Sequence, residues 1–244
     1  MTRPAVSVSA SSSAPPVRSP LPSASVSGPV SSKSAAPAKA ASDYKIFTNS
    51  DGTVVRWNPC APIHYAVNAS GAADSQGAVS DVQTAIGRVA AATGLRFVYV
   101  GSTATVPTKA WLDGGGGTTS ELVVAWARPG TAAGESDLFG TDADGEGGWW
   151  ESGTSSDGTH WVWQIKRGFV VIDPSGSAAY APGFGGGETR GVLLMHELGH
   201  AVGLGHVDNR RDVMFPIITS AAPATWGAGD LAGLAKVGAT GCIP

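Results

Sequence analysis

The sequence predicts an α/β (α+β) domain built around a mixed, twisted sheet, with a disordered tail in front of it. Three observations lead to this prediction. Short strand patterns are interleaved with helical patterns, a Ser- and Pro-rich segment precedes them, and a helix with closely spaced histidines lies near the end. The tail spans residues 1–43 and the domain spans residues 44–244.

The strands are predicted where apolar residues alternate with polar ones or form short continuous runs. They cover residues 62–68, 96–100, 121–127 and 169–173, with a hairpin over 147–152 and 160–165. The first helix, residues 73–93, has apolar side chains at helical spacing and ends at Gly94, a residue suited to a C-cap. A second helix, residues 188–203, is apolar nearly all round, so we expect it under the sheet. Asp230 begins the last helix.

Two histidines four residues apart lie near the end of the second helix. Such positions share one helix face, so His196 and His200 can present two imidazole nitrogens to one metal ion. Glu197 is adjacent to that face and can reach a water held on the metal, where a general base acts. Gly203 tolerates the positive φ of a sharp turn, after which His206 can return as a third ligand. The spacing predicts a zinc site with one catalytic carboxylate.

A second motif, Met214-Phe215-Pro216, follows, with its methionine eight residues after His206. Together the two motifs resemble the metzincin clan of zinc metalloproteases, in which a methionine-containing turn passes beneath the metal. Within that clan, the Met-x-Pro pattern is most similar to matrixins (matrix metalloproteinase-type peptidases) and their bacterial relatives. Matrixins usually carry Ser or Thr after the third histidine, where this chain has Val207. The alternative, a helix with incidental histidines, does not account for both motifs.

The resemblance implies a metzincin-like zincin fold with two parts. An upper subdomain would cover residues 44–206, and a small C-terminal subdomain at 207–244 would hold the Met-turn and the final helix. The implied activity is that of a zinc metalloendopeptidase with one catalytic Zn²⁺, acting on protein or peptide substrates through an activated water and the glutamate base. Met214 would pack beneath the metal, with Gly203 and Pro216 as structural support.

A catalytically weak, zinc-stabilised extracellular binding module is the alternative function. Such a module needs the three histidines for its metal but has no need of a general base, so the intact Glu197 favours the peptidase. Two roles are open for Asp230. It either anchors the Met-turn from behind or favours the first turn of its helix electrostatically.

The resemblance also implies where a substrate would lie. It would run extended beside an edge strand by strand addition, and Gly145-Glu146-Gly147-Gly148 is the candidate edge, with a flexible loop as the alternative. The side chain after the cleaved bond would enter a pocket lined by Val192, Ile217 and Ile218. Because this lining is apolar, we expect cleavage before sizeable apolar residues and poor cleavage before charged ones.

Four acidic residues lie in and beside a Gly-rich stretch: Asp137, Asp142, Asp144 and Glu146. They could hold Ca²⁺, a hard cation that takes six to eight oxygen ligands. The simpler reading, and the one that we expect, is a solvated acidic loop.

Composition and cysteines limit the partners and the compartment. A formal net charge of −3 argues against nucleic acid, and no segment is long and apolar enough to span a membrane. Cys60 and Cys242 are the two cysteines and lie near the two ends of the domain, so we expect one disulfide and a secreted, extracellular protein. Two buried free thiols are the alternative. No export signal is visible in the given sequence, and we expect a monomer.

The tail has the composition of a disordered stalk. Residues 1–43 hold 13 Ser and 7 Pro, with four basic residues against one acid. Such a segment buries too little apolar surface to offset the entropy lost on ordering. The alternative is an inhibitory propeptide, which is disfavoured because the tail contains no Cys or His that could bind the metal.

Overall fold

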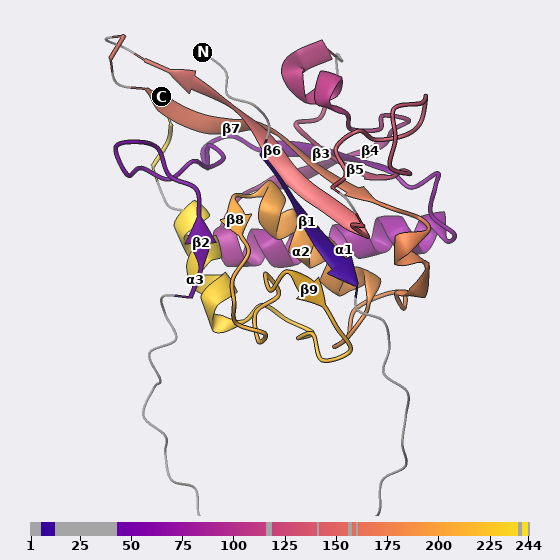
Figure 1. The fold of residues 1–244 in the computed structure, drawn as a ribbon. Helices are drawn as coiled ribbons and strands as arrows, with labels where there is room; N and C mark the ends of the chain where they lie inside the picture. Colours follow the sequence, from indigo (N-terminus) through magenta and orange to yellow (C-terminus); the bar gives the residue numbers. More distant parts are fainter. Residues whose placement is uncertain are drawn as a thin grey trace, which may run out of the picture.

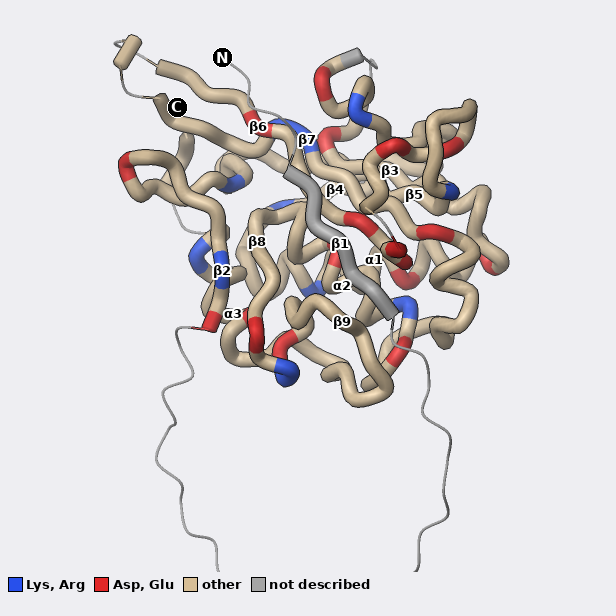
Figure 2. Tube along the Cα trace, in the orientation of Figure 1, with Lys and Arg blue, Asp and Glu red and all other residues tan. Residues whose placement is uncertain are grey.

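The computed structural model describes the backbone of residues 6–12, together with residues 43–115, 119–140, 142–155, 158–159, 161–238 and 241–243. Within these residues no helix is long and apolar enough to cross a membrane. Basic and acidic residues are dispersed over several elements (Figure 2).

A mixed sheet lies at the centre of the fold (Figure 1). Its five central strands are, in spatial order, β4 (Phe97–Ser102), β3 (Ile63–Asn68), β5 (Leu122–Trp126), β7 (Val162–Ile172) and β6 (Gly145–Thr154). The first four strands are parallel, and β6 is antiparallel to β7. Beyond β6, strand β1 (Val6–Ser12) and then β9 (Ile217–Ile218) extend the sheet to seven strands. The predicted α/β class with a mixed sheet is confirmed.

Helices α1 (Ser75–Thr93) and α2 (Arg190–Ala201) pack together, and α2 packs against the sheet at β6 and β7. Helix α3 (Ala228–Val237) packs against α1. The main core lies between the helices and the sheet, and a smaller cluster lies on the opposite face beside the π-helix η1 (Trp111–Gly115). Alternation along β5 explains the two clusters: Leu122 and Val124 face the helices, whereas Val123 faces η1. The core therefore holds α2 rigidly beneath β6.

Helix α1 ends where the sequence predicts and begins at Ser75, two residues after the predicted start. Asp74 is the N-cap, and its carboxylate accepts the Gly77 N–H at 3.0 Å. Gly94 closes the helix with φ of 75° and donates its N–H to the Ala90 carbonyl at 2.8 Å. This end was expected from the sequence because glycine adopts the left-handed conformation without steric cost.

The predicted hairpin and the predicted buried strand at 169–173 belong to one longer ladder. Strand β7 is continuous and pairs with β6, with a register shift between Trp150 and Glu151. Gly168 lies within β7 and serves close packing, because a Cβ there would lie 3.0 Å from the Trp57 ring. The prediction of two separate strands in this region is wrong.

Three short elements and a disulfide complete the domain. Strand β2 (Lys45–Ile46) pairs with β8 (Leu204–Gly205), and a 3₁₀-helix, η2 (Gly176–Ala179), follows β7. Cys60 and Cys242 form a disulfide that closes a loop of 182 residues, with a Cα–Cα distance of 5.3 Å. In the chain-entropy treatment, a loop of this length is worth about 5 kcal/mol of stability.

The predicted disordered stalk is wrong for one short segment. Residues 6–12 form β1, whose backbone pairs with two other strands. The physical reason is that an unpaired sheet edge can order a chain through backbone hydrogen bonds, which the composition of the segment does not reveal. Residues 1–5 and 13–42 lie outside the described residues, so the stalk and the subdomain boundaries stay predictions.

Candidate metal centre

Helix α2 is anchored at its start and carries two histidines on its buried face. Thr189 is the N-cap, and its hydroxyl accepts the backbone N–H three residues further on at 3.3 Å. Arg190 donates from Nε to the Asp81 carboxylate on α1 at 2.6 Å, which joins the two helices. His196 and His200 have no exposed surface. Their positions therefore follow from helical spacing on a fixed helix.

The chain leaves α2 through Gly203, as the sequence predicts. Gly203 has φ of 110° and donates its N–H to the His200 carbonyl at 2.9 Å. This backbone conformation strains any residue with a Cβ. The turn leads through β8 to the half-buried His206, whose ring lies beside those of His196 and His200.

The Nε2 atoms of the three histidines converge. The distances are 3.0 Å between His196 and His200, and 3.1 Å from each of these to His206. In the part of the chain that the structure describes, this is the one group of His, Cys, Asp and Glu residues with ligand atoms gathered in this way. In a tetrahedral zinc site with Zn–N distances of 2.0–2.1 Å, two ligand nitrogens are about 3.3 Å apart. The spacing is close to that of a zinc site.

The hydrogen bonds of two rings determine their tautomers. His196 Nδ1 lies 2.7 Å from the Val213 carbonyl, and His200 Nδ1 lies 2.8 Å from the Leu204 carbonyl. A carbonyl oxygen can only accept, so each Nδ1 carries the proton and each neutral ring has its lone pair on Nε2. Lone pairs directed at one point repel each other unless a cation lies between them, so this arrangement fits a metal ion.

Burial keeps these rings neutral. The pKa of His196 is lowered to about 3, first by burial and then by the proximity of His206, against the opposing effect of the Val213 carbonyl. The pKa of His200 is also well below its ordinary value, first because of burial and then because of the other two rings. Neutral imidazole is the form that binds metals.

Glu197 lies beside the histidines with a fully buried side chain. Among the residues whose side chains the structure describes, neither carboxylate oxygen of Glu197 has a hydrogen-bond partner. Its pKa is raised well above the ordinary value, first by burial and then by the charge of Glu146, although the nearby Gly147 amide opposes this shift. A buried carboxylate without a partner is costly, and a water molecule bound beside the three rings would provide the missing hydrogen bond.

The Met-turn packs against α2 next to the metal centre. Val207 donates its N–H to the Met214 carbonyl at 3.0 Å. A Cβ on Gly199 would lie 2.4 Å from the Met214 sulfur, so α2 has a glycine where the methionine packs against it. Pro216 is half-buried and leads into β9. Gly199 is a structural residue of the site that the spacing analysis missed, since nothing in the motif distinguishes it from an exposed position.

Asp230 anchors this turn, the first of its two predicted roles. Its carboxylate is buried and accepts backbone N–H groups from Val213 at 2.6 Å, Met214 at 3.2 Å and Gly227 at 2.9 Å. Burial raises the pKa of Asp230 to about 6, although these three hydrogen bonds oppose the shift. The turn is therefore tied to α3, far from the zinc motif in sequence.

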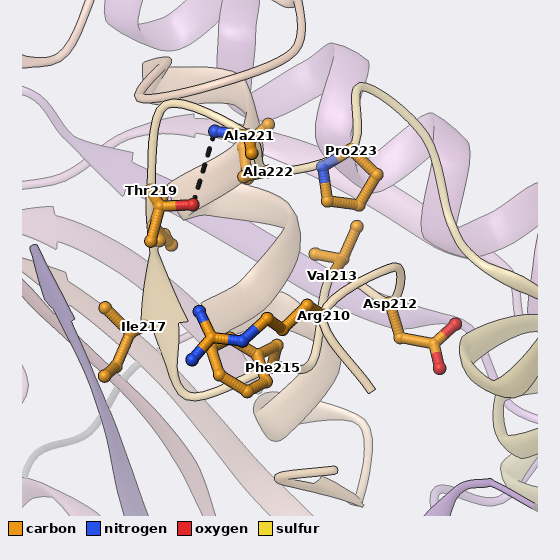
Figure 3. A pocket seen from close by; sticks show the side chains of 11 residues that line it. Arg210, Asp212, Val213, Phe215, Ile217, Thr219, Ala221, Ala222 and Pro223 are labelled. Atoms are coloured by element: carbon orange, nitrogen blue, oxygen red, sulfur yellow. Dashed lines mark hydrogen bonds between the residues drawn. The ribbon is translucent and has the colours of Figure 1, made fainter. Parts of the chain in front are cut away.

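The predicted pocket residues lie together beside the Met-turn (Figure 3). Val192, Ile217 and Ile218 are all in the lining of one cavity of about 70 Å³. Arg210 also lines it, with its guanidinium 4.7 Å from the centre of the Phe215 ring. Most of the lining is apolar, as expected, but two charged residues, Arg210 and Asp212, also line the cavity and were missed because they precede the Met-turn in sequence.

Gly147 and Gly148 lie in strand β6 rather than in a flexible loop. A Cβ on Gly147 would lie 2.1 Å from the Glu197 carbonyl oxygen, so β6 approaches α2 at a distance that only glycine allows. Gly145, two residues earlier, would place a Cβ 2.9 Å from Glu197 Oε1. Strand β6 therefore passes directly beside the candidate catalytic carboxylate, although β1 pairs with its other side and β6 is not an edge strand of the seven-stranded sheet.

The predicted solvated acidic loop is wrong in part. Glu146 is 2% exposed and lies in β6, where its carboxylate accepts the Gly140 N–H at 2.8 Å. Asp144 accepts the Tyr180 hydroxyl at 3.1 Å, and Asp137 accepts the Lys109 N–H at 2.8 Å. These carboxylates have protein partners because they hold loops around β6, a role that their spacing does not predict.

Comparison with known proteins supports the resemblance. The matrixin family matches residues 159–237, about a third of the chain, and this span contains the three histidines, Glu197, Met214 and Asp230. The crystal structure of metalloproteinase-II from Bacteroides fragilis is similar at 15% sequence identity with a TM-score of 0.36, covering 69% of this chain and 50% of that one. The chain thus spans about half the length of that protein. None of the curated proteins matches this sequence.

The family match confirms the resemblance to matrixin-like metzincins in the part of the chain that carries the site. Together with the three converging histidines, it supports a zinc metallopeptidase in general terms. The mechanism, the substrate and the cellular setting need further argument.

Proposed function

We propose that this chain is a zinc metalloendopeptidase, with His196, His200 and His206 as ligands and Glu197 as general base. One observation carries the proposal: three Nε2 atoms lie 3.0–3.1 Å apart beside a buried carboxylate without a hydrogen-bond partner. A structural metal site would need the histidines alone. The carboxylate fits a site that holds a reactive water.

A zinc ion bound there would lower the pKa of a bound water and polarise the substrate carbonyl. Glu197 accepts the proton of the attacking water at a carboxylate oxygen and later delivers it to the leaving amine. The Val213 and Leu204 carbonyls hold the two helical imidazoles in the tautomer that leaves Nε2 free. The packing of α2, β6 and the Met-turn limits the access of bulk water, which strengthens electrostatic effects at the site.

A substrate would bind as an extended strand along β6, in the place beside it that β1 takes in this structure. The residue after the cleaved bond would enter the cavity lined by Val192, Ile217 and Ile218. Each buried methylene contributes about 0.8 kcal/mol, so we expect cleavage before Leu, Phe or Met. Charged residues of either sign should be disfavoured by the mostly apolar lining.

The setting that we propose is extracellular, with the chain acting as a monomer. The Cys60–Cys242 disulfide supports export, because such bonds persist in oxidising compartments. Intact mass of the exported protein, measured with and without reductant and alkylation, tests this. Two free thiols in the exported protein would contradict it.

The proposal is tested by incubating the purified protein with casein and a peptide library, with and without a zinc chelator, and sequencing the products. We expect cleavage that stops with chelator, returns with added zinc, and occurs before apolar residues. Cleavage that persists in chelator would contradict the zinc mechanism. Zinc binding without any cleavage would favour the binding module, and predominantly charged residues after the cut would refute the assigned pocket.

A further inference from the structure

A second cavity lies where the three helices meet, and its volume is about 290 Å³, against about 70 Å³ for the cavity beside the Met-turn. Among the described residues, the two cavities share no lining residue. In the second cavity, α1 contributes Arg88, Ala91 and Ala92, α2 contributes Met195, and α3 with the loop before it contributes Trp226 and Leu231. This cavity is therefore a candidate binding site separate from the proposed substrate cleft.

The wall of this helix cavity is mostly apolar and in part open to solvent. Met195 belongs to the main core and Trp226 packs against it, so both side chains have fixed surroundings. Leu231 is 47% exposed beside them, although leucine is among the residues most often buried. Apolar surface of this kind favours a ligand with a hydrocarbon part, because each methylene that leaves water contributes favourably to binding.

Arg88 is the charged group in the wall. Its half-buried guanidinium donates from Nη1 to the Ala224 carbonyl at 2.8 Å and lies 4.1 Å from the centre of the Phe184 ring. Within the described part of the chain, no carboxylate forms an ion pair with Arg88, and its Nε and Nη2 donors have no acceptor. A guanidinium binds a carboxylate through two parallel hydrogen bonds, so this free edge favours an anion.

Trp226 places a second donor at the same wall. Its indole N–H is buried and has no acceptor among the residues whose side chains the structure describes. Buried donors in folded proteins are nearly always paired, so an unpaired donor beside a cavity indicates that a ligand or a water molecule supplies the acceptor. A carboxylate has both the charge that Arg88 lacks and free acceptor oxygens.

We propose that the helix cavity binds an aliphatic carboxylate, with the hydrocarbon chain against Met195, Trp226 and Leu231 and the head group on Arg88. An apolar cation would place a like charge beside the guanidinium, and a neutral apolar ligand would cover its donors without replacing the water that hydrates them. Neither zinc nor Glu197 takes part, so the site is independent of the proposed peptidase function.

Binding is measured by isothermal titration calorimetry in the full chain, with decanoate below its micelle concentration as the probe. We expect saturable binding, with an affinity that rises by up to about fourfold for each methylene from hexanoate to decanoate. Decyltrimethylammonium, which has the same chain and the opposite charge, should bind at least tenfold more weakly. Decanoate that binds no more tightly than decyltrimethylammonium overturns the proposal.

The titration is repeated with zinc-loaded and with chelator-treated protein, because a zinc ion in the candidate metal centre can itself bind a carboxylate. We expect equal decanoate affinity in the two forms. Binding that is confined to the zinc-loaded form overturns the proposal. Since the measurement needs neither zinc nor turnover, its result does not depend on whether the chain is a peptidase.

Two pairs of variants locate the binding site. Arg88→Met keeps a long side chain but removes the charge, so it should weaken decanoate binding at least tenfold. Arg128→Met makes the same substitution at an exposed arginine outside the cavity and should leave the affinity unchanged. Equal affinity in these two variants overturns the proposal.

The second pair changes charge at the exposed position 231, because Arg88 also holds the Ala224 carbonyl and its loss can disturb the loop there. Leu231→Glu and Leu231→Lys remove the same apolar side chain and should fold equally well. Leu231→Glu should bind decanoate at least tenfold more weakly than Leu231→Lys, since a like charge then lies beside the carboxylate. Equal decanoate affinity in this pair places the ligand elsewhere and overturns the proposal.

Discussion

The two halves of the metal centre are built in different ways. His196 and His200 lie one turn apart on α2, and helical spacing alone brings their nitrogens within 3.0 Å. His206 lies on an irregular segment, positioned by Gly203, the Met-turn and the distant Asp230. The positions of His196 and His200 follow from local helical geometry, whereas that of His206 depends on tertiary contacts. Substitutions that spare the ligands should therefore weaken zinc binding when they lie in the second half.

The largest effect is expected for Asp230→Ala. It leaves three backbone N–H groups without their acceptor, and each buried unsatisfied donor costs about 1–3 kcal/mol. We expect the free energy of unfolding to fall by several kcal/mol and zinc affinity to fall as well, although Asp230 does not contact the histidines. Chemical denaturation and zinc competition measure both. Unchanged zinc affinity in Asp230→Ala would contradict the distinction between the two halves of the metal centre.

The same residue gives a pH dependence. Its pKa of about 6 in the folded protein exceeds the ordinary 3.8, so between these values the folded state binds the proton more tightly than the unfolded chain. The Asp230 contribution to the free energy of unfolding is therefore complete below about pH 4 and falls, by about 3 kcal/mol at most, as pH rises through 6. As pH rises from about 4 to above 6, the free energy of unfolding of metal-free wild type should fall relative to that of metal-free Asp230→Asn. A relative gain in stability would contradict the assignment.

A smaller effect is expected for Gly203→Ala, with Gly94→Ala as the control. Both glycines have positive φ, at 110° and 75°, so each alanine should cost about 1–3 kcal/mol of stability. A Cβ at Gly203 would also lie 3.3 Å from the Val55 carbonyl oxygen, whereas Gly94 has open space. Zinc affinity should fall in Gly203→Ala alone, as measured by zinc competition. Equal zinc affinity in the two variants would show that the turn does not position His206.

The smallest effect is expected in the helical half. Thr189→Ala removes the N-cap of α2 and should cost about 1 kcal/mol, as should Asp74→Ala at the N-cap of α1. Zinc affinity should stay nearly the same in both variants, because the core and the Arg190–Asp81 pair still hold α2. A loss of affinity in Thr189→Ala as large as that in Gly203→Ala would contradict the distinction between the halves.

The sequence predicts most of what local geometry determines. The Gly94 C-cap of α1, the histidine spacing and the positive φ of Gly203 follow from residue type and position. The pairing of Cys60 with Cys242 follows from there being two cysteines. The family resemblance added the Met-turn and the pocket residues, whose place in the structure depends on contacts between distant segments.

Features that depend on tertiary contacts were missed or misread. Glu146 looks like a loop acid, but β6 buries it beside Glu197. Residues 160–165 and 169–173 look like two strands, but they belong to the continuous β7, in which Gly168 allows close contact with Trp57. Residues 6–12 look disordered because their pairing needs the edges of β6 and β9, which the segment itself does not encode. In each case the determining partner lies far away in sequence.

The most direct test of the central claim measures zinc content and peptidase activity in the same samples of wild type, Glu197→Ala and the triple variant His196→Ala/His200→Ala/His206→Ala. We predict one zinc per chain in the first two proteins and none in the third. Activity should fall by a factor of about 100 to 10,000 in Glu197→Ala, the usual effect of losing a general base. Full activity in Glu197→Ala, or one zinc still bound by the triple variant, would contradict the account.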